Sequence, residues 1–184
     1  MQVAIYSGSF DPLHIGHLAI LETLSREFDQ VRLVVSPQNP LKDSSKSVNA
    51  DSRLDAARAA LGRHPELDNV EVDPVEYSLP VPNYTITTLD FLRDINPDDS
   101  FTLAIGADNL GSIRRWCDYS RILKEYGVAV YPRTGYEMET IKAELLEEDP
   151  AYRITLLDCP LVDISSTEIR RRLAAGEPVS DLLM

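Results

Sequence analysis

The stretch S-G-S-F-D-P-L-H-I-G-H, residues 7–17, decides the fold of this chain. It follows a short apolar run, residues 2–6, that is typical of a buried strand, and it leads into a helix on which Leu18, Leu21 and Leu24 share one face. A strand, a glycine turn and a helix in this order open a doubly wound α/β sheet, where ligands bind beyond the carboxyl ends of the strands. We therefore expect a ligand site at this turn.

The residue types in the turn indicate that the ligand is a phosphate group. Gly8 and Ser9 leave room for phosphate oxygens to approach backbone N–H groups, and a helix that starts near Gly16 offers its positive end. His14 and His17 are three residues apart, so both rings can face one anion. A histidine at a helix start can equally be a cap. The spacing matches neither a dinucleotide fingerprint nor a Walker A loop.

The rest of the chain continues the alternation of strands and helices. Apolar runs at residues 31–35, 70–72, 101–105, 128–131 and 154–157 predict five further strands, and amphipathic patterns between them predict helices. We expect a Rossmann-like parallel sheet with helices on both faces, built as a single domain over residues 1–184. Residues 36–47 and 76–83 break the rhythm and predict loops over the site.

Composition excludes several classes of protein. Thirty acidic residues against 18 Lys and Arg give a net charge of −12, which disfavours binding to nucleic acid. The sequence contains no long uncharged apolar run, so we expect no membrane span. The two cysteines are too few and too poorly spaced for a disulfide framework or a zinc site, so we expect no protein metal site and a cytoplasmic location.

Three later segments add candidate ligand groups. The run I-S-S-T-E-I-R, residues 164–170, fits a capping box of Ser165 with Glu168, and it also offers hydroxyls and Arg170 to a polyphosphate. Asp108 follows the apolar run at residues 101–105, so we expect it at the same sheet edge as His14. Its carboxylate could accept hydrogen bonds from ribose hydroxyls, or it could cap a helix. Trp116 lies in a polar setting where its face could stack on a ring, although a lone tryptophan is commonly core.

Taken together, these motifs resemble bacterial-type nicotinate-nucleotide adenylyltransferases of the H-x-G-H nucleotidyltransferase superfamily. The matching segments run in order along nearly the whole chain: F-D-P-L-H-I-G-H-L, P-x-x-P-x-K at residues 37–42, N-Y-T, G-A-D, Trp116 and I-S-S-T-E-I-R. The resemblance implies transfer of AMP from ATP to the 5′-phosphate of nicotinate mononucleotide, giving deamido-NAD and pyrophosphate in NAD biosynthesis, with Mg²⁺ held mainly by the ATP phosphates.

The resemblance also implies roles for individual residues. The catalytic residues would be His14, His17 and Arg170. The ATP-binding residues would be Gly8, Ser9, Phe10, Gly16, Gly106, Asp108, Ser165, Ser166 and Thr167. The mononucleotide would meet Lys42, Asn83, Tyr84, Thr85, Trp116 and Cys117.

The chain departs from the family pattern at three places, and rival functions remain. Leu41 stands where the family often has histidine, Thr87 where an acid is common, and Cys117 where an aromatic residue is common. Phosphopantetheine adenylyltransferase is the nearest alternative, although it usually has threonine in place of His14. A non-catalytic nucleotide sensor is the alternative from another class. The sequence does not predict an oligomeric state.

Overall fold

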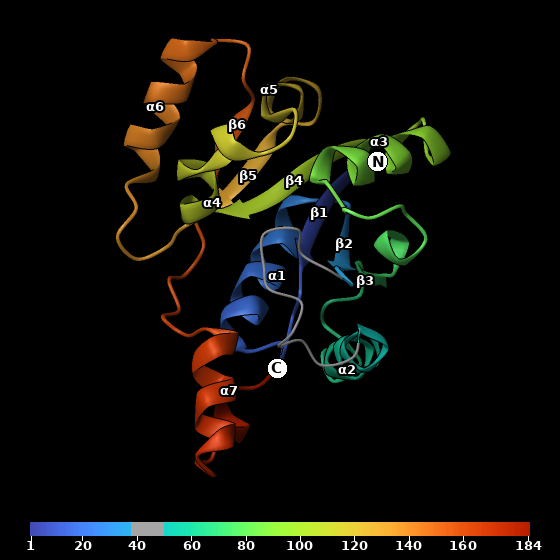
Figure 1. Cartoon of the computed structure of the whole chain (residues 1–184), viewed down its shortest axis with the longest axis vertical. Coiled ribbons are helices and arrows are strands. Elements are labelled where there is room, and N and C mark those ends of the chain that lie inside the picture. Colours follow the sequence, from blue (N-terminus) through green and yellow to red (C-terminus); the bar gives the residue numbers. More distant parts are fainter. Residues whose placement is uncertain (38–49) are drawn as a thin grey trace.

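The computed structural model describes residues 1–37 and 50–184, and these residues form one six-stranded sheet (Figure 1). The strands are β1 (Gln2–Gly8), β2 (Gln30–Val35), β3 (Val70–Asp73), β4 (Ser100–Gly106), β5 (Val128–Tyr131) and β6 (Ile154–Leu156). Their order is β3-β2-β1-β4-β5-β6, and each neighbouring pair is parallel. The predicted Rossmann-like sheet is therefore confirmed, with the switch in strand order beside β1.

Helices cover both faces, because successive strand residues point to opposite sides. On one face, Ala4 and Tyr6 of β1 pack with α1 (Ile15–Glu27) and α2 (Ala50–Leu61). On the other, Val3 and Ile5 pack with α3 (Thr85–Ile95), α4 (Ala107–Gly111), η4 (Ile122–Tyr126) and α6 (Met138–Glu148). The central strands β1, β4 and β5 are buried on both sides over most of their length, which explains why they read in the sequence as continuous apolar runs.

The remaining elements are short, apart from the last helix. They are η2 (Val75–Tyr77), η3 (Ile113–Arg115), α5 (Tyr119–Arg121), α7 (Ser166–Ala174) and η5 (Ser180–Leu182). In Figure 1, α7 projects away from the sheet below α1. It is tied back to the turn after β1, because the Ser166 hydroxyl donates to the Pro12 carbonyl at 3.0 Å. The residue before the C-terminus, Leu183, forms an antiparallel bridge with His14.

The first strand is longer than the apolar run predicts. Residues 7 and 8 continue the ladder, with Ser7 opposite Val34 and Gly8 opposite Val35. The polar Ser7 does not interrupt the strand, because its hydroxyl meets that of Ser36 at 3.1 Å, beyond the end of β2. The phosphate turn thus starts at the carboxyl edge of the sheet, as the fold requires.

Among the described residues, no helix is long and apolar enough to cross a membrane. Both cysteines are free: Cys117 is exposed and Cys159 is buried.

Candidate active site

Two cavities open at the carboxyl edge of the sheet, and they share the residues at the end of β1. The first, which we call the phosphate cavity, has a volume of about 220 Å³. The second, the acceptor cavity, has about 200 Å³. Ser7, Gly8 and Tyr131 line both. Two ligands bound there would therefore meet beside the first strand.

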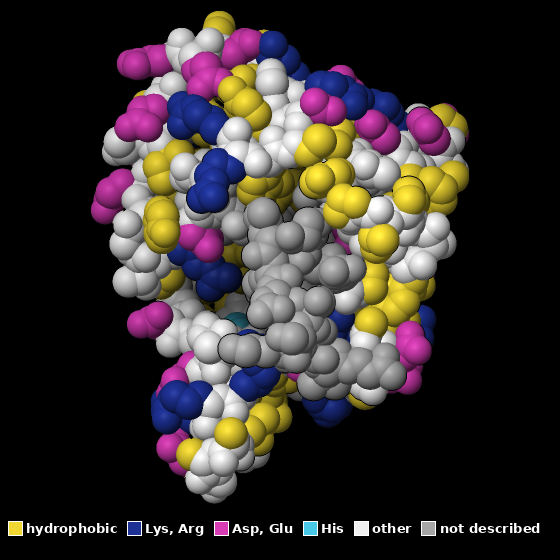
Figure 2. All heavy atoms as spheres, viewed as in Figure 1, with side chains coloured by type: hydrophobic (Ala, Val, Ile, Leu, Met, Phe, Trp, Pro, Cys, Tyr) yellow, Lys and Arg dark blue, Asp and Glu magenta, His cyan; other side chains and the backbone are white. Residues whose placement is uncertain are grey.

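The phosphate cavity gathers residues that lie far apart in the sequence. Its lining includes nine of the predicted residues: Gly8, Ser9, Phe10, His14, His17, Ser165, Ser166, Thr167 and Arg170. The starts of α1 and α7 both contribute, so unpaired backbone N–H groups and positive helix ends converge on it. In Figure 2, a histidine side chain is visible between Lys and Arg side chains above the α7 lobe. The cavity is built for an anion.

The two predicted histidines are stacked, with ring centroids 3.7 Å apart. His14 is the N-cap of α1, and its Nδ1 accepts the N–H of Gly16 at 3.1 Å. Nδ1 of His17 accepts the N–H of His14 at 3.2 Å, which completes a reciprocal cap. Because a backbone N–H can only donate, each ring in its neutral form carries its proton on Nε2. The capping bonds therefore fix the tautomer of two rings that also line the phosphate cavity.

Both histidines are neutral at pH 7. Burial, and then the positive charge of Arg133, lowers the pKa of His14 to about 4. Burial, with further contributions from His14 and Arg133, holds the pKa of His17 well below its usual value. The pair therefore presents two neutral N–H donors, while positive charge in the cavity comes from arginine.

Gly16 is required by the histidines themselves. A Cβ at this position would lie 3.0 Å from the His14 ring and 3.2 Å from Ile164. The sequence interpretation placed this glycine against the nucleotide; in the structure, a side chain there would first displace the His14 imidazole. The motif needs glycine because the cap folds the first ring back over the start of its own helix.

Arg170 reaches from α7 across to the phosphate turn. Its guanidinium donates to the carbonyl of Asp11 at 2.5 Å and to the Thr167 hydroxyl at 3.2 Å. Ser165 caps α7 by accepting the Glu168 N–H at 3.1 Å, which is the first half of the predicted capping box; the Glu168 side chain binds other residues, so the second half does not form. The carboxylate of Glu168 binds Arg171 and Arg172. The two neighbours of Arg170 are thus paired on their own helix.

Gly106 and Asp108 lie at the end of β4, beside the phosphate cavity rather than in its lining. Asp108 Oδ1 is 3.7 Å from Nε of Arg133, too far for a hydrogen bond, and both atoms are buried without a hydrogen-bond partner in the described structure. A Cβ on Gly106 would collide with both side chains. The two groups form an ion pair at this distance, and the ribose contact of Asp108 stays a prediction.

The acceptor cavity brings together every predicted mononucleotide residue that the structure describes: Asn83, Tyr84, Thr85, Trp116 and Cys117. Lys42 and Leu41 lie outside the described residues. Thr85 begins α3, whose first N–H groups have no acceptor within the helix. The N–H of Trp116 donates to the carbonyl of Ile113 at 2.9 Å. A ligand in this cavity would therefore meet the N–H of Cys117 instead.

Sequence reasoning missed Arg133, which lines the phosphate cavity. The guanidinium lies 5.2 Å from the centroid of the Tyr131 ring and faces the histidines closely enough to lower their pKa values. The available signal was positional, because Arg133 follows directly after β5 at the edge where ligands bind. Without the strand order, one arginine among many gave no reason for selection.

Glu76 and Arg53 were also missed, and both position other site residues. Glu76 is 5% exposed in the acceptor cavity; its carboxylate accepts the Thr88 hydroxyl at 3.0 Å, and its carbonyl accepts from Asn83 at 3.0 Å. Burial raises the pKa of this carboxyl. Arg53 is 3% exposed and donates to the carbonyls of Ser9 and Ser36, each at 2.8 Å. These two buried side chains hold the turns that form both cavities.

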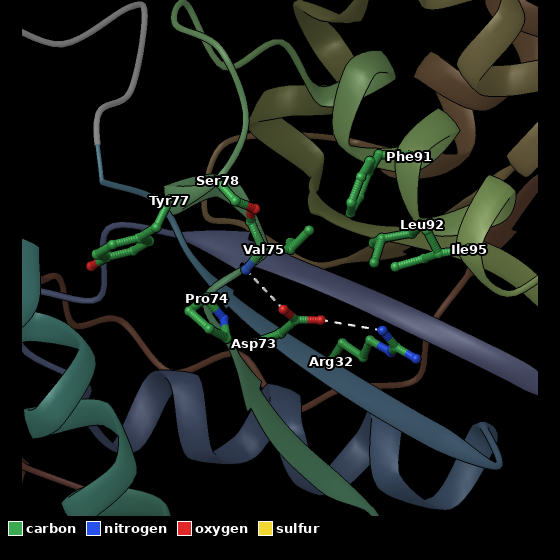
Figure 3. A pocket seen from close by; sticks show the side chains of 9 residues that line it. All are labelled: Arg32, Asp73, Pro74, Val75, Tyr77, Ser78, Phe91, Leu92 and Ile95. Atoms are coloured by element: carbon green, nitrogen blue, oxygen red, sulfur yellow. Dashed lines mark hydrogen bonds and ion pairs between the residues drawn. The ribbon is translucent and has the colours of Figure 1, made fainter.

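A separate hollow lies beside η2 and α3, and its lining includes Asp73, Val75 and Leu92 (Figure 3). Asp73 in this hollow accepts hydrogen bonds from Arg32 at 3.3 Å and from the N–H of Val75 at 2.8 Å, whereas Nε of Arg32 is buried without a hydrogen-bond partner among the described residues. The hollow shares no lining residue with the two cavities. It is therefore not part of this site.

The parallel sheet and the two cavities at its carboxyl edge agree with the nucleotidyltransferase class of α/β proteins. The chain belongs to the cytidylyltransferase-like family, whose family model matches residues 5–172. It is 34% identical to a protein of Flavobacterium johnsoniae over all of this chain and 92% of that relative, and 37% identical to one of Cytophaga hutchinsonii over 92% and 84%. Both relatives are named "Probable nicotinate-nucleotide adenylyltransferase".

A solved structure confirms the fold. The nicotinic acid mononucleotide adenylyltransferase of Plasmodium falciparum, complexed with NaAD, matches with a TM-score of 0.80 and 20% identity, over 98% of this chain and 87% of that one.

Proposed function

We propose that this chain transfers AMP from ATP to the 5′-phosphate of nicotinate mononucleotide, releasing pyrophosphate and forming the dinucleotide. The observation that carries this proposal is the junction of the two cavities at Ser7, Gly8 and Tyr131. ATP phosphates in one cavity and an acceptor phosphate in the other would meet there. The names of the relatives support the same reaction.

The chemistry follows from the groups present. An oxygen of the acceptor phosphate, already ionised at pH 7, attacks the α-phosphorus, and the bond to the β-phosphate oxygen breaks as pyrophosphate leaves. No residue needs to form a covalent intermediate. The Nε2–H donors of His14 and His17, with Arg170 and Arg133, stabilise negative charge as it moves onto the leaving group. Positioning and electrostatics supply the catalysis.

We propose Mg²⁺ as the cofactor, held mainly by ATP phosphates and water. The phosphate cavity fits this arrangement because its protein groups are hydrogen-bond donors for phosphate oxygens. No cluster of three His, Cys, Asp or Glu side chains that could hold a metal occurs within residues 1–37 and 50–184. When bound, Mg²⁺ neutralises charge on the β- and γ-phosphates. We also propose that the chain acts in the cytoplasm as a single domain.

The choice of acceptor follows from the donors of the acceptor cavity. The first N–H groups of α3 and the N–H of Cys117 fit a carboxylate, which only accepts hydrogen bonds. A carboxamide would turn its NH₂ toward one of these donors, at a cost of about 1–3 kcal/mol. We therefore expect nicotinate mononucleotide to be preferred over nicotinamide mononucleotide by at least about tenfold in kcat/KM.

A pyrophosphate-release assay with ATP and each of nicotinate mononucleotide, nicotinamide mononucleotide and phosphopantetheine tests the proposal. His17→Ala serves as the matched control and should lower kcat by about 100-fold with little change in the KM for the acceptor. Equal turnover of the two mononucleotides would show that the acceptor cavity does not recognise the carboxylate. Faster turnover of phosphopantetheine would replace the proposed acceptor, and no turnover would favour a nucleotide sensor.

A further inference from the structure

The acceptor cavity has two walls that come from different parts of the chain. One wall is the start of α3, with Tyr84 and Thr85; the other is the turn between η3 and α5, with Trp116 and Cys117. Residues of β4 line the cavity as well. The spacing of the two walls therefore depends on how α3 is held relative to α5 and η4.

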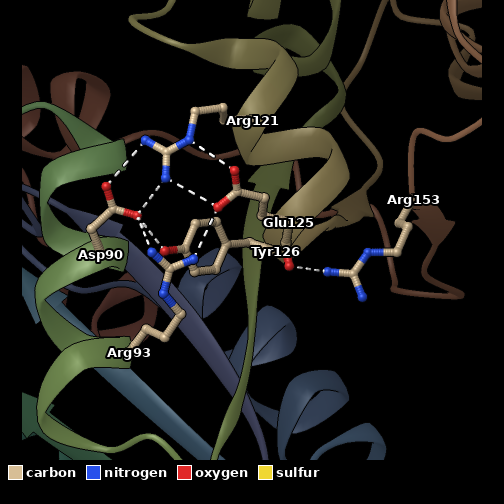
Figure 4. Close-up of polar contacts among 6 residues, drawn as sticks. All are labelled: Asp90, Arg93, Arg121, Glu125, Tyr126 and Arg153. Atoms are coloured by element: carbon tan, nitrogen blue, oxygen red, sulfur yellow. Dashed lines mark hydrogen bonds and ion pairs between the residues drawn. The ribbon is translucent and has the colours of Figure 1, made fainter.

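A cluster of five polar side chains joins these elements on the same face of the sheet (Figure 4). We call it the Asp90 cluster: Asp90 and Arg93 of α3, Arg121 of α5, and Glu125 and Tyr126 of η4.

The hydrogen bonds that join α3 to α5 and η4 converge on Asp90. This carboxylate accepts two bonds from Arg121, at 3.0 and 3.2 Å, and one from the Tyr126 hydroxyl at 2.5 Å. Arg93 crosses in the other direction to Glu125 at 2.9 Å. Arg121 also binds Glu125, at 2.8 Å. Two arginines face two acids, so the cluster is internally neutralised.

Each half of the cluster is connected to its wall by short, ordered backbone. Asp90 is five residues after Thr85 on the same helix, where buried Leu89 and Leu92 fix α3 against the sheet. Arg121 is five residues after Trp116, whose carbonyl accepts the N–H of Tyr119 at 3.3 Å. A shift of either half would move the adjoining wall.

The geometry of η4 makes this connection possible. The segment is a π-helix, a rare form that occurs often at functional sites. Its residues Ile122 and Leu123 are fully buried, while its residues Glu125 and Tyr126 extend toward α3. The N–H of Gly127, at φ +77°, ends the segment by donating to the carbonyl of Ile122 at 2.8 Å.

We propose that the Asp90 cluster sets the distance between the two walls of the acceptor cavity and so acts as a positioning device for the mononucleotide. The proposal rests on the proposed function. The cluster acts on local geometry rather than on global stability, because each partly exposed ion pair contributes little to the free energy of unfolding. A network with a two-bond arginine–carboxylate pair restricts orientation more than a single pair does.

The direct test is binding of nicotinate mononucleotide, followed by the fluorescence of Trp116, the single tryptophan of the chain. Asp90→Asn should weaken binding and raise the KM for the mononucleotide by about tenfold. The KM for ATP and kcat should change less than about twofold, because the phosphate cavity lies outside the cluster. Glu125→Gln is the second variant, in case Asp90→Asn folds poorly, and should act in the same direction.

Asp149→Asn is the matched control. Lys124 of the same π-helix pairs with Asp149 at 2.5 Å, on the side of α6 rather than α3. Losing this pair should leave mononucleotide binding unchanged.

The outcomes are distinguishable. If the wild-type chain does not bind nicotinate mononucleotide, the proposed function fails, and this proposal fails with it. If the wild type binds but Asp90→Asn and Glu125→Gln bind equally well, only the positioning role is overturned. It is also overturned if Asp149→Asn weakens binding as much, or if ATP and the mononucleotide are affected alike, because a general structural role would produce those results.

Discussion

His14 and His17 each serve two purposes at the level of single residues. As caps, their Nδ1 atoms accept backbone N–H groups at the start of α1; as site residues, their rings line the phosphate cavity. The capping bonds fix the tautomer, so the functional donors are consequences of the local fold. Replacing His14, the N-cap of α1, therefore changes both helix and site, and a residue that can cap a helix is the informative substitute at this position.

We predict that His14 titrates near pH 4, measured by NMR of its ring C–H signals between pH 3 and 8. Burial is the first cause and the Arg133 guanidinium the second. Arg133→Gln should therefore move the pKa upward, toward the ordinary value of about 6.5. A His14 that titrates near 6.5 in the wild type would contradict the buried, neutral state.

The same shift predicts how stability depends on pH. The folded-state pKa is lowered, so the unfolded chain binds the proton first as the pH falls. The stabilisation is present above about pH 6.5 and is lost as the pH falls toward 4. His14→Asn retains an N-cap acceptor and should lose less stability over this window in chemical denaturation. Parallel curves for both proteins would contradict it.

At the level of elements, α7 presents its three consecutive arginines differently. Arg170 lines the phosphate cavity and contacts Asp11, whereas Arg171 and Arg172 bind Glu168 of their own helix. Successive residues of a helix point in different directions, so three consecutive arginines cannot all face the same cavity. One arginine of the helix thus lines the phosphate cavity, and the other two form ion pairs within the helix.

Arg170→Ala should raise the KM for ATP by about 30-fold, since a charge-assisted contact to phosphate contributes on the order of 2 kcal/mol. Arg171→Ala is the matched control and should leave the KM for ATP unchanged. Melting temperatures should stay close for both, because both side chains are exposed. Equal losses of ATP affinity, or a large drop in Tm for Arg170→Ala alone, would rule out this assignment.

At the level of the whole molecule, the sheet order places two cavities at the carboxyl edge beside β1. Because they share Ser7, Gly8 and Tyr131 and are otherwise lined by different residues, we expect both substrates to bind at once. We predict sequential kinetics: double-reciprocal initial-rate plots at varied ATP and mononucleotide should intersect. Exchange of labelled pyrophosphate into ATP should require the acceptor. Parallel lines, or exchange with ATP alone, would indicate a covalent adenylyl intermediate instead.

Local patterns in the sequence predict the class of fold, and they also predict most of the described residues that line the two cavities' ligand-facing turns. The apolar runs predicted the strands, because a parallel sheet buried on both faces requires them. The H-x-G-H and I-S-S-T-E-I-R segments identified two helix starts, because caps and glycine turns are local in sequence. Such signals lie within a few residues of one another, so they can be read without the tertiary structure.

Only the tertiary structure decided the contacts between distant segments. Arg133 meets the histidines because β5 is the second strand from β1 in the sheet, and no spacing in the sequence encodes that distance. Glu76 and Arg53 hold the turns from elements whose partners are known only once the strands are ordered. The Asp90 cluster likewise depends on α3 and η4 packing on one face. Residues far apart along the chain become neighbours through strand order and packing, which a local pattern does not contain.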